Sequence, residues 1–137
     1  MRLKMLGALA IAVTTFGTDA SADNFDGAAP LICATVESFD CAPNSSCIKD
    51  SPESIALPRF IRLDFTAKTV VADRIGGGEP IKAEIATQQV QEGHLLLQGM
   101  QNGNAWSMAV TQATGDMSLS IVSHGVGFVV FGHCTGL

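Results

Sequence analysis

Residues 94–111 read HLLLQGMQNGNAWSMAVT, and this stretch decides the fold. Trp106, Met108 and Val110 alternate with small or polar residues, and a period of two is typical of a half-buried β-strand. Asn102-Gly103 precedes this strand and is a strong signal for a short hairpin, because both positions tolerate positive φ. The stretch therefore predicts two antiparallel strands, at 94–100 and 105–111.

The same alternation continues on both sides of this hairpin. Ile81, Ala83 and Ile85 alternate with charged residues, and apolar residues 117, 119 and 121 alternate with serine. Polar and glycine-containing turns separate these segments, and one turn of helix near residues 51–55 is the exception to the β pattern. We expect strands over 31–39, 59–66, 69–74, 81–90, 94–100, 105–111, 117–122 and 126–133.

The short connections favour antiparallel hairpins over crossovers through helices. Residues 95–97 and 126–131 are apolar on both faces, so these strands need cover on both sides or line a closed barrel. Pairing the first strand with the last would close the sheet and remove its exposed edges. The predicted fold class is therefore all-β, a small antiparallel barrel of about eight strands. A two-sheet β-sandwich is the alternative.

The chain has four cysteines, at positions 33, 41, 47 and 134, and this even number favours two disulfides. We expect Cys41 to pair with Cys47 across a loop rich in turn-forming residues, and Cys33 with Cys134. The second bridge would join the first strand to the last. Metal binding is the rival use of these cysteines, but no C-x-x-C spacing is present.

The first 22 residues have the three parts of a cleavable signal peptide. Arg2 and Lys4 are basic, Leu6–Phe16 is apolar, and Ala20-Ser21-Ala22 is a small-x-small cleavage site. The apolar run has about half the roughly 20 residues that a membrane span needs. We expect cleavage near Ala22-Asp23, a single β domain over 23–137, and a location in the periplasm or outside the cell.

Removal of Arg2, Lys4 and Asp19 would take the net charge from −5 to about −6. The remaining sequence has no cluster of Lys and Arg, which argues against a nucleic-acid partner. A mild acidic excess is common in soluble proteins, and it would also suit a basic protein partner.

No motif predicts catalysis, a cofactor or a metal. His94, His124 and His133 could form a zinc site only if the fold brought them together, since no two share a strand at ligand spacing. The carboxylates of the central strands alternate with Arg and Lys, as solvated strand faces do. Gly76-Gly77-Gly78 lacks the Lys-Ser/Thr of a phosphate loop. The candidate ligand-lining or core residues are Trp106, Met108, Phe128 and Phe131.

Three segments, Gly103–Ser107, Ala113-Thr114-Gly115 and Gly127–Cys134, resemble the C-terminal half of a family of small exported proteobacterial proteins of unassigned function. Phe25–Cys33 is similar to their start. These motifs are packing and turn residues, so the resemblance implies no chemistry. The chain also resembles periplasmic inhibitors of C-type lysozyme, which are eight-stranded barrels with a cysteine near each end. It lacks their Ser-Gly-x-x-Tyr inhibitory pattern, so no inhibitory residue is implied.

Two functions follow from these observations. The first is a non-catalytic envelope protein that binds another macromolecule, as an inhibitor would. The second is a barrel that carries a small apolar ligand. Alternation also places Phe128 and Val130 on one face of the last strand and Val129 and Phe131 on the other. In a closed barrel one of these sets fills the interior, and we expect the segment Asp23–Pro30, with Phe25 as its anchor, to cover the other set.

Overall fold

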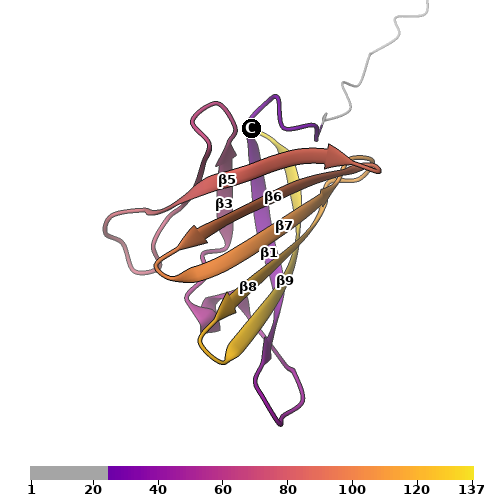
Figure 1. Ribbon diagram of the computed structural model, residues 1–137. Helices are drawn as coiled ribbons and strands as arrows, with labels where there is room; N and C mark the ends of the chain where they lie inside the picture. Colours follow the sequence, from indigo (N-terminus) through magenta and orange to yellow (C-terminus); the bar gives the residue numbers. More distant parts are fainter. Residues whose placement is uncertain (1–24) are drawn as a thin grey trace, which may run out of the picture.

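The computed structural model describes residues 25–137, which form a closed antiparallel barrel of eight strands with a ninth strand outside it (Figure 1). The signal peptide predicted from the sequence lies outside the described residues. The elements are β1 (Leu31–Cys41), β2 (Ile48–Asp50), η1 (Pro52–Ile55), β3 (Phe60–Asp64), β4 (Thr69–Ala72), β5 (Ile81–Gln91), β6 (His94–Gln101), β7 (Asn104–Thr111), β8 (Asp116–Ser123) and β9 (Val126–Gly136).

Closure depends on β1, which pairs with β3 on one edge and with β9 on the other. The β1–β9 pairing runs from Leu31 opposite Gly136 to Cys41 opposite Gly127, so the sheet closes into a barrel and the sandwich alternative is wrong. A bulge interrupts the pairing opposite Gly132. A Cβ at Gly132 would overlap the carbonyl oxygen of Ala34, so this glycine permits the close approach of the two strands.

The turns of the two central hairpins, β5–β6 and β6–β7, have two central residues with positive φ. Asn102 and Gly103 have φ values of 50° and 81°, and the equivalent residues of the β5–β6 turn, Glu92 and Gly93, have 50° and 78°. Positive φ at both central positions matches the right-handed twist of the flanking strands. The Asn-Gly prediction is therefore confirmed.

One end of the barrel is filled by side chains. Leu95, Leu97, Val110 and Val130 are each fully buried there. Phe25 closes this end: its side chain is 5% exposed and its ring lies against the β7–β8 turn. Phe25 is therefore buried, as expected of an anchor. The expected cover over the outer face of β9 is wrong, because Phe25 lies at the end of the barrel.

Both predicted disulfides are present, Cys33–Cys134 and Cys41–Cys47. Cys33 and Cys134 are direct register partners on β1 and β9, so the bridge lies across the seam that closes the barrel. The second bridge closes the loop between β1 and β2. Two disulfides are compatible with an oxidising compartment.

The sequence missed β2, because its three residues are all exposed and give no alternation of apolar and polar positions. The helical turn expected near residues 51–55 is η1, a four-residue 3-10 helix. Among the described residues, no helix is long and apolar enough to cross a membrane.

Candidate functional site

The barrel contains a cavity at the end opposite Phe25, next to the β6–β7 turn. Its volume is about 200 Å³. Its wall is formed by side chains of β3 to β9, with β6 contributing at its end, and by the last residue of η1 and the chain just after it. The lining residues are Ile55, Ala56, Leu57, Pro58, Ile61, Val70, Ala72, Ile81, Ala83, Gln101, Asn104, Trp106, Met108, Leu119, Ile121 and Phe128.

The chemistry of this wall is apolar and uncharged. None of the lining residues carries a charge, and only Gln101 and Asn104 have polar groups at the ends of their side chains apart from the indole of Trp106. Gln101 and Asn104 are register partners beside the β6–β7 turn, so their amides lie at the rim. The wall suits an apolar molecule, and the rim offers hydrogen bonds to a polar end.

Trp106 is the only tryptophan in the chain and lies on the cavity wall. Its side chain is 9% exposed, and within the described residues no acceptor reaches its buried indole Nε1. A buried donor without an acceptor costs about 1–3 kcal/mol. Such a group is unusual in a folded protein, and it indicates that this wall lacks a hydrogen-bond acceptor for Trp106.

The segment Ile55–Pro58 forms one side of the cavity. It is fixed at its end by Thr35, whose hydroxyl donates to the Pro58 carbonyl oxygen at 3.0 Å. Ala56 adopts the left-handed conformation with φ of 57°, which is uncommon for a residue other than glycine. Ala56 is the C-cap of η1, and the backbone N–H of Leu57 donates to the Pro52 carbonyl oxygen at 3.0 Å, so the chain turns where η1 ends.

Three of the four candidate residues from the sequence meet at this cavity: Trp106, Met108 and Phe128 all line it. The fourth, Phe131, lies outside the barrel and is 43% exposed. Its ring makes an edge contact with Phe39 of β1, with centroids 6.1 Å apart. The alternation predicted for β9 is confirmed, since Val130 is fully buried while Phe131 faces outward.

Sequence reasoning missed the wall contributed by Ile55–Pro58 and the rim amides. The available signal was two apolar residues between Pro52 and Pro58: Ile55, at the end of the expected helical turn, and Leu57 just after it. Apolar side chains in a connecting segment are stabilised when they pack against the core of the protein.

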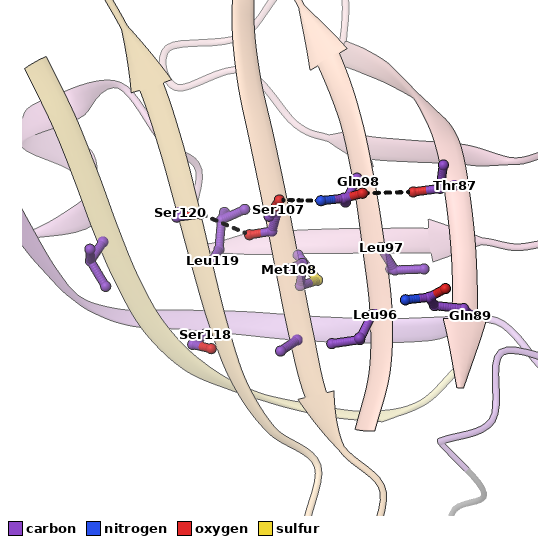
Figure 2. A pocket seen from close by; sticks show the side chains of 12 residues that line it. Thr87, Gln89, Leu96, Leu97, Gln98, Ser107, Met108, Ser118, Leu119 and Ser120 are labelled. Atoms are coloured by element: carbon purple, nitrogen blue, oxygen red, sulfur yellow. Dashed lines mark hydrogen bonds between the residues drawn. The ribbon is translucent and has the colours of Figure 1, made fainter. Parts of the chain in front are cut away.

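A second concave feature, hereafter the hollow, lies on the outer face of β5–β9 and has a volume of about 290 Å³. Figure 2 shows a row of polar side chains across it. Thr87 Oγ1 donates to Gln98 Oε1 at 3.2 Å, and Gln98 Nε2 donates to Ser107 Oγ at 3.1 Å. The hollow is lined by Thr87, Gln89, Leu96, Leu97, Gln98, Ser107, Met108, Ala109, Ser118, Leu119, Ser120 and Val129.

The three histidines do not converge. His94 Nδ1 lies 3.0 Å from the carbonyl oxygen of Glu92, and His133 Nδ1 lies 3.4 Å from Asp116 Oδ1. His124 lies in the β8–β9 turn, at the opposite end of β9 from His133. Within residues 25–137, no three His, Cys, Asp or Glu side chains gather as metal ligands do.

Two exposed carboxylates have lowered pKa values. The pKa of Asp116 is lowered by a hydrogen bond from Thr114 Oγ1, at 2.7 Å, and then by His133. The pKa of Glu53 is lowered by a backbone hydrogen bond and by Arg59, whose Nη2 lies 2.9 Å from Glu53 Oε1. Neither residue borders the cavity or the hollow, so these shifts belong to surface ion pairs.

No protein-family model, curated protein or solved structure matches this chain. The functional argument therefore rests on the structure itself: an antiparallel barrel closed by a disulfide, with side chains filling one end and a cavity at the other.

Proposed function

We propose that the protein is a non-catalytic binding protein that holds a compact apolar molecule in the cavity at the open end of its barrel. The observation that supports this proposal is the uncharged cavity wall with the buried indole N–H of Trp106, for which residues 25–137 supply no acceptor. We further propose that the protein acts in the periplasm or outside the cell after loss of a signal peptide, since both disulfides suit that compartment.

The volume limits the ligand. Pockets for drug-sized molecules are about 300–1,000 Å³, while an apolar cavity of about 150 Å³ holds benzene. A cavity of about 200 Å³ therefore suits one ring or a short branched chain. Burial of a charge against this wall would be costly, so the ligand is neutral, with any polar group at the Gln101 and Asn104 rim.

NMR can test this proposal, because one tryptophan gives one indole cross-peak in a proton–nitrogen spectrum. We expect cyclohexanol to shift this cross-peak saturably, with a dissociation constant on the order of 1 mM. Cyclohexylammonium has the same ring with a charge and should leave the cross-peak unchanged, because its charge would have to be desolvated.

The matched variants are Ala83→Leu, which fills the cavity from β5, and Ala67→Leu, an equal enlargement in the exposed β3–β4 turn. Ala83→Leu should abolish the cyclohexanol shift, and Ala67→Leu should retain it. The proposal fails if cyclohexanol causes no saturable shift, or if both variants respond like the native protein.

Binding of another macromolecule is the second candidate function. The observation that favours it is the hollow, since a concave and uncharged sheet face is unusual on a chain with a net charge of −5. No acidic residue lines the hollow, so a basic partner would find no complementary charge there.

A further inference from the structure

Trp106 differs from the other buried polar side chains of the barrel, Thr35 and Ser38, in its hydrogen bonding. Thr35 Oγ1 donates to the Pro58 carbonyl oxygen at 3.0 Å. Ser38 Oγ donates to the Asp50 carbonyl oxygen at 3.1 Å. Among the described residues, the indole Nε1 of Trp106 is the only buried side-chain nitrogen or oxygen without a partner. The fold therefore satisfies its buried polar side chains elsewhere and leaves this one group on the cavity wall.

The edge of the indole that carries the nitrogen lies over Gly99. A Cβ added at Gly99 would be 2.7 Å from Trp106 Cε2, the ring carbon bonded to Nε1. Because glycine has no side chain, the register partner of Trp106 on β6 brings no side-chain acceptor to this edge. The two amide side chains of the wall, Gln101 and Asn104, lie beside the β6–β7 turn, and neither accepts the indole N–H. The wall thus offers a donor without an acceptor.

A molecule seated in the cavity is in a position to supply the missing acceptor. Nε1 is buried, so bulk water does not satisfy it, whereas Trp106 itself lines the cavity of about 200 Å³. A ligand that brings an acceptor to the indole removes the cost of the unpaired N–H, and a hydrocarbon of the same shape leaves that cost in place. A site of this kind discriminates between two molecules that differ only in one hydrogen-bonding atom.

We propose that the ligand of the cavity carries a neutral hydrogen-bond acceptor, the oxygen of a ketone, ester or lactone, which receives the indole N–H of Trp106. This inference rests on the proposed function, because it names the chemical class of the ligand of the same cavity. The acceptor is not a carboxylate, since no cationic side chain of the wall would pair with a buried negative charge. Any donor group of the ligand belongs at the rim, with the amides of Gln101 and Asn104.

Cyclohexanone and methylenecyclohexane are the matched probes, because they share one ring and differ in the acceptor oxygen. They also differ in hydration, so the ratio of their dissociation constants is compared between the native protein and Trp106→Phe. NMR titrations followed by the backbone amides of Ala83 and Ile121, which line the cavity, give this ratio in both proteins. Because the hydration of the free probes cancels, we expect the relative preference for the ketone to fall about tenfold in Trp106→Phe.

The native protein gives a second measurement that does not depend on the folding of the variant. The indole N–H proton should move to higher frequency when cyclohexanone binds, because it enters a hydrogen bond, and methylenecyclohexane should not cause this change. Ala67→Leu, in the exposed β3–β4 turn, is the control and should keep both the ratio and the response of the indole proton.

The outcomes separate this inference from the proposed function. If both probes bind but their ratio is the same in Trp106→Phe, the cavity is a binding site that does not require an acceptor, and this inference alone is overturned. Equal responses of the indole proton to the two probes overturn it in the same way. If neither probe binds and cyclohexanol also causes no saturable shift, the proposed function fails and this inference fails with it.

Discussion

Gly99 of β6 and Trp106 of β7 are direct register partners, and the indole ring occupies the place where a side chain of Gly99 would lie. A Cβ at Gly99 would be 2.5 Å from Trp106 Cζ2 and would also overlap the carbonyl oxygen of Glu84. The glycine therefore sets the position of the only tryptophan on the cavity wall.

We expect Gly99→Ala to destabilise the protein by about 1–3 kcal/mol, because the methyl group must displace both the indole of Trp106 and the backbone of β5. Urea unfolding measures the free energy, and the indole cross-peak should move in the same variant. Gly127→Ala is the control, since a Cβ at Gly127 meets nothing within 4 Å. Its effect should stay within about 0.5 kcal/mol. Equal effects of the two substitutions would contradict the packing role of Gly99.

The two disulfides should differ in their contribution to stability. Cys33 and Cys134 are 101 residues apart, while Cys41 and Cys47 are 6 apart. In the chain-entropy model, the long bridge contributes about 4–5 kcal/mol and the short one about 2 kcal/mol. Replacing both cysteines of the long bridge by serine should therefore destabilise the protein much more than the same change at the short bridge. Urea unfolding of the two double variants measures this difference, and equal losses would contradict it.

All four cysteines are paired in the structure, and this pairing gives a direct chemical test. Thiol labelling of the denatured, unreduced protein should modify no cysteine, whereas labelling after reduction should modify all four. Modification of two cysteines without reduction would show that one bridge is absent from the isolated protein.

The eight strands of the barrel were predictable because each carries its own local signal, which the exposed β2 lacks. The period of two in β7 and β8 and the Asn102-Gly103 turn require no knowledge of distant residues. Closure was predictable from the strands that are apolar on both faces and from Cys33 and Cys134, since a bridge between them joins residues that are far apart in sequence.

The cavity was not predictable, because volume depends on how side chains from separate elements fill a common space. Trp106, Met108 and Phe128 share the inward face by alternation, so the sequence could nominate them. It could not show that Phe25 fills one end of the barrel while Ile55–Pro58 leaves space at the other. The left-handed Ala56, which turns that segment, has no signature in residue type.

The lowered pKa of Asp116 predicts a pH-dependent contribution to stability. Folding favours the charged carboxylate, so the contribution is complete above the ordinary pKa of 3.8 and is lost as pH falls through the lower folded value. Asp116→Asn should therefore unfold at lower urea than the native protein at about pH 7, and the two should converge near pH ~2. A difference that persists at the lower pH would assign the effect to something other than the charge.

Phe25 provides the last test, because it is the residue by which the N-terminal segment joins the core. Its ring packs directly against Gly115, since a Cβ added at Gly115 would lie only 2.7 Å from Phe25 Cζ. The carbonyl oxygen of Phe25 also accepts a hydrogen bond from Gln112 Nε2 at 3.3 Å. Phe25→Ala would open the filled end of the barrel, and the expected loss is about 3–5 kcal/mol in urea unfolding. Phe60→Ala removes an equal ring from β3, where it is 54% exposed, and should cost less than about 0.5 kcal/mol. If Phe25→Ala were equally mild, the segment would be loosely attached and Leu95 and Met117 would close this end without it.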